Sequence, residues 1–175
     1  MGEQPLRPDP HGSPLGGPVE GYAPEGERPP LGSYAAMSTA FLAGCIAFYL
    51  DARRKDRLPE GISTRDLVLI GAATHKLSRL IAKDKVTSFL RAPFKRYEGA
   101  AGPAELSEKT RGEGFQEAVG ELLGCPYCLG LWISSAMTAG LVAAPRETRL
   151  VTSTLSALTI ADFLQLAYGI GQEQL

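Results

Sequence analysis

One uncharged stretch constrains what this chain can fold into more than any other feature of its sequence. From Pro126 to Ala144 the only ionisable side chains are the Tyr127 phenol and the Cys128 thiol. As an α-helix these 19 residues would cover roughly 28 Å, close to the ~30 Å hydrocarbon core of a bilayer. The sequence therefore predicts a membrane helix at 126–144.

Two cysteines stand at the start of this helix. Pro126 suits the first helical position, which makes Cys125 the N-cap and places Cys128 in the first turn. The positive end of the helix dipole favours the thiolate form of a thiol in that position. We therefore take Cys125 and Cys128 as the candidate catalytic residues and as the candidate metal ligands.

Two further apolar blocks complete the predicted membrane part. Residues 34–50 carry no charge, and the basic run Arg53-Arg54-Lys55 that follows is typical of a cytoplasmic helix end. Residues 150–170 contain one carboxylate, that of Asp162. The polar residues of this block recur at every third position, which predicts that they face protein rather than lipid. They are Ser156, Thr159, Asp162 and Gln165.

Residues 66–82 form an amphipathic helical pattern that allows two placements. The helix could lie on the surface with its basic face on lipid headgroups. It could instead cross the membrane and turn His75 and Arg79 toward the protein interior. Because an unpaired charge within a membrane is costly, we expect Asp162 to pair with Arg79, or failing that with His75. Such a pair would hold two helices together or form part of a proton or ion path.

The remaining segments are polar. Residues 83–124 form a polar insert with a basic patch, Arg91, Lys95 and Arg96, that is expected to face anionic lipid headgroups. Residues 1–33 are rich in Pro, Gly and acidic residues and predict a disordered tail. No strand alternation stands out. The expected fold class is all-α, a small multi-pass helical membrane protein with three or four membrane helices, in which 34–50 is an additional helix and 66–170 the core.

Composition limits the functions open to the chain. Its formal charge is −1, with 18 basic and 19 acidic residues, so no nucleic-acid partner is expected. Three cysteines are too few for a secreted disulfide framework. The expected partners are the lipid bilayer with its anionic headgroups and either a second copy or another membrane protein.

The distribution of charge predicts an orientation. Residues 51–125 hold 14 of the 18 Lys and Arg residues. If the 66–82 helix lies on the surface, the positive-inside rule places all of this segment, with the dithiol, in the cytoplasm. The dithiol would then be reduced in the resting cell.

From about Leu67 to Gly169 the chain resembles the domain of unknown function 1360 family of small bacterial membrane proteins, which includes a sporulation-associated Bacillus member. The resemblance rests on the segments THKLSRLIAKD, TSFLRAPFKRYEG and GELLGCPYCLGLWISS and on the last apolar helix. It implies a multi-pass protein of a bacterial inner membrane. It supplies no established activity.

Three interpretations of the dithiol stay open. Cys-Pro-Tyr-Cys is the glutaredoxin active-site tetrapeptide, and although no βαβ pattern surrounds it here, thiol redox chemistry needs only adjacent activated thiols. Zinc would need further ligands, which Cys45 and His75 could supply only at the same depth in the membrane; no other cofactor is expected. The third interpretation is that the cysteines are small packing residues.

Two function hypotheses follow from these interpretations. The first is a non-enzymatic membrane scaffold or assembly factor in envelope or developmental processes. The second is a membrane-anchored dithiol protein that exchanges disulfides or binds a metal through Cys125 and Cys128.

Overall fold

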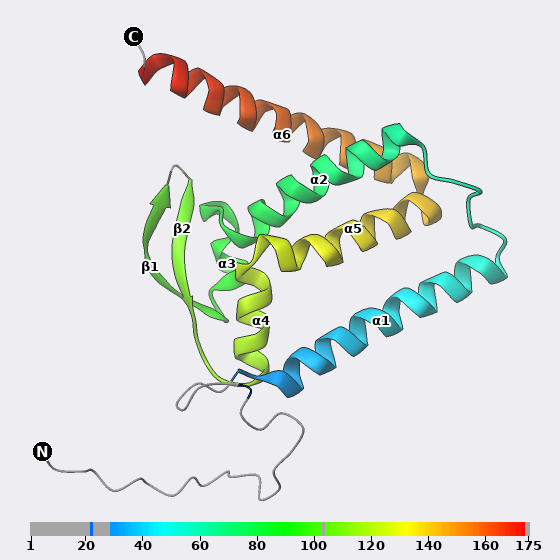
Figure 1. Cartoon of the computed structure of the whole chain (residues 1–175), viewed down its shortest axis with the longest axis horizontal. Coiled ribbons are helices and arrows are strands. Elements are labelled where there is room, and N and C mark those ends of the chain that lie inside the picture. The colour runs from blue at the N-terminus through cyan, green and yellow to red at the C-terminus, as the bar shows by residue number, and fades with distance from the viewer. Residues whose placement is uncertain (1–21, 23–28, 103, 174–175) are drawn as a thin grey trace, which may run out of the picture.

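The computed structural model describes residue 22, residues 29–102 and residues 104–173 (Figure 1). Its four long helices are α1 (Leu31–Arg54), α2 (Thr64–Ala82), α5 (Pro126–Ala143) and α6 (Pro145–Glu173). α2 lies between α5 and α6 and packs along both, while α1 lies beside α5. Most of the predicted 1–33 tail is outside the described residues, and its last three residues already belong to α1.

Residues between α2 and α5 fold into a small unit at one end of the long helices (Figure 1). Its elements are η1 (Lys85–Thr87), α3 (Ser88–Arg91), β1 (Lys95–Gly102), β2 (Glu105–Thr110) and α4 (Phe115–Gly124). β1 and β2 pair antiparallel, with Lys95 opposite Thr110 and Gly102 opposite Glu105. The all-α prediction is therefore wrong for the insert, which contains a β-hairpin, although the structure as a whole is mostly helical.

The hairpin escaped prediction because polar residues carry its alternation. From Leu106 onward the less exposed positions of β2 are Leu106, Glu108 and Thr110, and the residues between them are exposed; Glu105, at the start of the strand, is also partly covered. Only one of the three inward residues is apolar, so the strand has no hydrophobic period of two.

Arg91 occupies the centre of the insert. Its side chain is fully buried and forms an ion pair with Glu108, which is also nearly buried. Its Nη1 donates to the Ile81 carbonyl at 2.6 Å, and its Nη2 donates to the Asp84 carbonyl at 3.1 Å. Arg91 thus joins the end of α2 to α3 and β2. The expectation that it faces lipid is wrong, because its charge is needed to satisfy a carboxylate and two carbonyls that the insert buries.

A polar seam joins α2 to α6. Ser156 Oγ donates to the Leu69 carbonyl and Thr159 Oγ1 to the Ala72 carbonyl, both at 2.9 Å. Three residues farther along α6, Asp162 accepts from Lys76 Nζ at 2.7 Å. Ser156 and Thr159 of the predicted stripe are buried against α2, Asp162 is exposed but bonded to Lys76, and Gln165 is exposed. At the other end of the seam, Arg149 makes a bidentate ion pair with Asp66, at 2.8 and 2.9 Å.

The buried apolar core is small and most large apolar side chains of α1 and α6 are exposed. Ile70 and Ala73 of α2 pack with Leu129, Ile133 and Met137 of α5. Among the described residues, three helices are long and apolar enough to cross a membrane: Leu31–Arg54, Pro126–Ala143 and Pro145–Gln172. Exposed apolar surface of this extent is unusual on a soluble monomer and indicates membrane association.

The buried ion pair predicts a large loss of stability on substitution. Arg91→Met should destabilise the fold by about 3–5 kcal/mol, because it leaves Glu108 buried without a countercharge. Chemical denaturation of the detergent-solubilised protein measures this loss, and Arg96→Met, at an exposed position of β1, is the matched control. Equal effects of the two variants would show that Arg91 is a surface residue.

Candidate functional site

The dithiol lies at a sharp corner between two helices. α4 ends at Gly124 and α5 begins at Pro126, so Cys125 is both the C-cap of α4 and the N-cap of α5. Proline at the first position of α5 fits because it has no N–H to leave unpaired. The backbone of Cys125 is extended (φ −111°, ψ 106°), which lets the chain change direction between the helices.

The two sulfurs are in direct contact. The Cys128 thiol donates to Cys125 Sγ at 2.8 Å, and the Cys128 backbone N–H donates to the same sulfur at 3.3 Å. Both cysteines are free thiols, and Cys128 is exposed. Cys125 thus accepts two hydrogen bonds at the positive end of α5, an arrangement that stabilises a thiolate.

The electrostatic environment of Cys125 acts in the same direction. Burial raises the pKa of its thiol, but hydrogen bonds from Cys128 and Tyr127 and the charge of Lys83 outweigh burial, and the net pKa is below its ordinary value. The Lys95 side chain lies over Gly124, the residue before Cys125, where an added Cβ would collide with its ammonium group. Burial lowers the pKa of Lys95. These surroundings therefore stabilise the thiolate form of Cys125.

Two cavities open on either side of the dithiol helix. Toward α1, an apolar groove of about 620 Å³ is lined by Tyr34, Leu122, Cys128 and Trp132. Toward α2, a cleft of about 320 Å³ is lined by His75, Arg79, Pro126 and Tyr127. The expected site residues His75 and Arg79 therefore lie near the dithiol helix as well as near α6.

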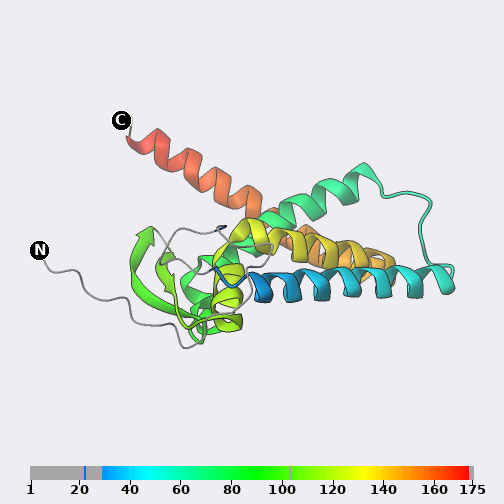
Figure 2. The same cartoon turned by 60° about the horizontal axis from the view of Figure 1, so that its bottom comes forward.

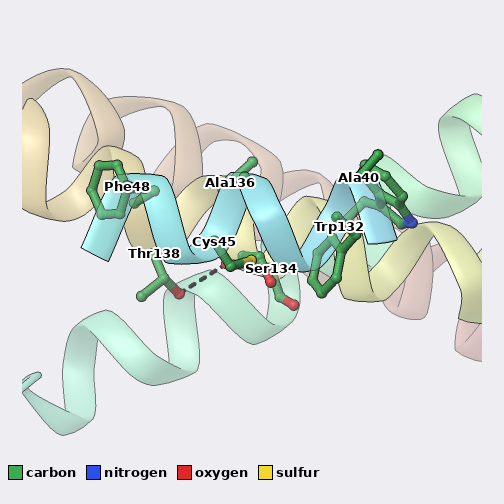
Figure 3. Close-up of a pocket in the computed structure, with 11 residues that line it drawn as sticks. Ala40, Cys45, Phe48, Trp132, Ser134, Ala136 and Thr138 are labelled. Atoms are coloured by element: carbon green, nitrogen blue, oxygen red, sulfur yellow. Dashed lines mark hydrogen bonds between the residues drawn. The ribbon is translucent and has the colours of Figure 1, made fainter. Parts of the chain in front are cut away.

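Cys45 belongs to a different place. It lines a groove of about 490 Å³ between α1 and α5, together with Phe48, Trp132 and Thr138 (Figure 3). Thr138 hydrogen-bonds to the Ser134 carbonyl on the wall of this groove at 2.8 Å. Within the described part of the chain, no group of three His, Cys, Asp or Glu side chains could hold a metal ion. Cys45 and His75 do not join the dithiol in one site.

The polar pair that the sequence predicts within the membrane has a different composition in the structure. Asp162 pairs with Lys76 rather than with Arg79, and Arg79 pairs with Glu105 of the hairpin. His75 stacks on Phe163, with ring centroids 6.1 Å apart. Lys76 and Arg79 are one turn apart on the same face of α2, and the extended hairpin, which the sequence pattern did not reveal, takes the second cation.

The basic patch is divided by the fold. Arg91 is buried, Lys95 is half-buried against Gly124, and Arg96 is exposed on β1. Only Arg96 is placed as a lipid-facing residue would be. Sequence reasoning missed four charged residues: Lys76, Asp84, Glu105 and Glu108. Each of them is a charge next to an apolar segment or within a polar strand.

Comparison with known proteins places this geometry in a family. The model of the family described as "Protein of unknown function (DUF1360)" matches residues 69–168. "Sporulation protein YjcA" of Bacillus subtilis is 26% identical over 102 residues, which cover 57% of this chain and 86% of that protein. "UPF0713 protein YngL" of Bacillus subtilis is 26% identical over 112 residues, which cover 63% and 83%. No solved structure matches.

The chain belongs to the DUF1360 family. The matched range begins within α2 and ends within α6, so it contains the dithiol, the insert and the polar seam except for Asp66, while α1 lies outside it.

The geometry at Cys125 predicts its reactivity. Its alkylation by iodoacetamide should titrate below the ordinary thiol pKa of about 8.5, because the thiolate is stabilised at neutral pH. Lys83→Met should raise the pKa of Cys125 and slow its alkylation at pH 7 about twofold, since a nearby positive charge is lost. Fragment-ion mass spectrometry distinguishes Cys125 from Cys128. Lys85→Met, at an exposed position two residues away, is the control, and an equal effect from it would contradict a specific role for Lys83.

Proposed function

We propose that this chain is a multi-pass integral protein of a bacterial inner membrane in which α2 crosses with the other three long helices. The supporting observation is that α2 packs between α5 and α6, both of which are long and apolar enough to span. A helix lying flat on the membrane surface could not pack along two spanning helices. This packing therefore supports a crossing α2 over the alternative in which 66–82 lies on headgroups.

The charges of α2 are compatible with this placement. Asp66 and Lys76 pair with Arg149 and Asp162 of α6. These ion pairs reduce the cost of charges near or within the hydrocarbon layer. Hydroxyl groups of α6 bond to α2 carbonyls between the two ion pairs, so the polar face of α2 is directed to protein.

In this membrane setting we propose a role as a small scaffold or assembly factor in envelope or developmental processes. The support is the rigid cap that the insert forms at one end of the bundle. Arg91 joins the insert to α2, and the hydrogen bond from Tyr34 to Glu121 joins α1 to α4. A relative carries the name of a sporulation protein. The proposed partners are anionic lipid headgroups, a second copy of the chain or another membrane protein, with no cofactor.

A second candidate function is favoured by the contact between the two sulfurs. In disulfide exchange the Cys125 thiolate would attack one sulfur of a substrate disulfide and release the other as a thiol. The Cys128 thiol would then displace the bound sulfur, leaving a Cys125–Cys128 disulfide and a second substrate thiol. Zinc binding by this pair would require ligands beyond it, for example the same pair from a second copy.

The membrane proposal predicts that the two ends of α2 lie on opposite sides. In a background with all native cysteines replaced by serine, Glu60→Cys and Val86→Cys should differ in labelling by an impermeant maleimide on intact spheroplasts. Once α2 crosses, the distribution of Lys and Arg gives no strong preference for either orientation, so one of the two positions should label in intact cells and the other only after breakage. Labelling of Glu60→Cys alone would place the dithiol end in the cytoplasm. Labelling of both, or neither, in intact cells would show that α2 does not cross. The reverse pattern would place the dithiol outside.

The two candidate functions predict different results from a complementation experiment. If the chain acts as a scaffold, the Cys125→Ser, Cys128→Ser double variant should fully restore the phenotype of a deletion strain, because serine keeps the size and the capping geometry of cysteine. Cys45→Ser is the matched control. Loss of complementation by the double variant, with normal amounts of protein in the membrane fraction, would replace the scaffold role with the dithiol role.

A further inference from the structure

A separate cavity of about 880 Å³ lies between the end of α2, the hairpin and the C-terminal half of α6. Figures 1 and 2 show α6 continuing past the other long helices on the side of the molecule where the hairpin lies. Five charged side chains line the cavity, and of these only Arg79 also lines the cleft beside the dithiol helix. They are Lys76, Arg79, Asp84, Glu105 and Asp162.

Two ion pairs in this cavity leave hydrogen-bonding capacity unused. Lys76 bonds to Asp162 at 2.7 Å and Arg79 bonds to Glu105, each through one nitrogen. An ammonium has three N–H donors and a guanidinium has five, and each carboxylate can accept several hydrogen bonds. The cavity therefore offers surplus donors and surplus acceptors close together.

Asp84 adds a third carboxylate. The chain following α2 pairs with β2 through Lys85 N–H to the Ala104 carbonyl at 2.9 Å and Leu106 N–H to the Lys83 carbonyl at 3.0 Å, which fixes Asp84 beside Glu105. No hydrogen bond to the Asp84 carboxylate is found among the described residues, and burial raises its pKa. With two cations and three carboxylates, the cavity favours a ligand that brings a positive group.

The α6 wall of the cavity is apolar. Leu166 and Ile170 line it and are more than half exposed, at 62% and 51%. They continue the membrane helix beyond Asp162. A ligand with a polar head and a hydrocarbon chain could place its head among the charges and its chain along this wall.

We propose that this cavity binds the headgroup of a phospholipid with a primary amine, phosphatidylethanolamine. The ammonium would donate to Asp84 and to the spare carboxylate oxygens, the phosphate would accept from Lys76 and Arg79, and one acyl chain would lie along Leu166 and Ile170. A choline headgroup has no N–H to donate, and a glycerol headgroup has no positive charge to balance Asp84. This goes beyond the scaffold role and rests on the proposed membrane insertion alone.

The test is lipid retention by the full-length protein in detergent, measured by native mass spectrometry. Phosphatidylethanolamine, phosphatidylcholine and phosphatidylglycerol with identical acyl chains are added in equal amounts. Wild type should retain phosphatidylethanolamine about tenfold better than the other two, since each lacks a charge-assisted hydrogen bond that the amine makes. Asp84→Asn should remove most of this preference. Glu98→Gln, which removes an exposed carboxylate of β1 away from the cavity, should keep it.

The wild-type comparison needs no variant, so a folding defect in Asp84→Asn would leave the proposal open to refutation. Equal retention of the three lipids, or a preference for phosphatidylglycerol, would overturn it. Equal losses in Asp84→Asn and Glu98→Gln would overturn the assignment to this cavity. If soluble phosphoethanolamine displaced the lipid at equal concentration, the site would be one for the free headgroup and not for the lipid. If carbonate extraction released the protein from membranes while its preference for phosphatidylethanolamine remained, the membrane proposal would fail and the lipid site would stand.

Discussion

The arrangement of the long helices depends on how α2 satisfies its polar groups. α2 carries charges along a face that would be costly in contact with lipid, and α6 supplies a matching row of partners. Ion pairs at Asp66 and Lys76 enclose two hydroxyl–carbonyl bonds, and together they fix both the axial position and the parallel direction of the two helices. Once α2 is held in this way, its opposite face is free to pack on Leu129 and Ile133 of α5.

The insert repeats the same solution at the end of the bundle. Arg91 is buried because the Ile81 carbonyl of α2, the Asp84 carbonyl that follows the helix and the Glu108 carboxylate would otherwise be buried without this partner. α4 packs closely on the other elements of the insert and so completes the cap. At Gly120 a Cβ would lie within 2.8 Å of the Phe94 carbonyl oxygen, so a larger residue would push α4 away and move the dithiol corner that follows it. The cap therefore positions the dithiol, and it also positions the charged cavity that lies beside α6.

The sequence predicts those parts of this structure whose energy is local or set by the bilayer. Uncharged length predicts α1, α5 and α6, and proline after cysteine predicts the start of α5 where it is found. The choice between Lys76 and Arg79 as partner of Asp162 could not be predicted, because both lie on one face and only the axial offset of α2 against α6 selects between them. The hairpin and the burial of Arg91 could not be predicted separately, since Glu108 reads as a surface residue in the sequence until Arg91 is known to be its partner.

Packing alone does not explain why the two residues at the dithiol corner are cysteines. Cys125 is the N-cap of α5, but serine, aspartate and asparagine are the preferred N-cap residues. The side chain of each would accept the same hydrogen bond from the backbone N–H of residue 128. Small size likewise does not require sulfur at position 128, where the side chain is exposed toward the groove that contains Trp132. What sulfur adds over oxygen is a lower pKa and reversible bonding to another sulfur or to a soft metal. The packing interpretation thus accounts for the shape of the corner, and the dithiol role proposed above would in addition account for the identity of the two residues.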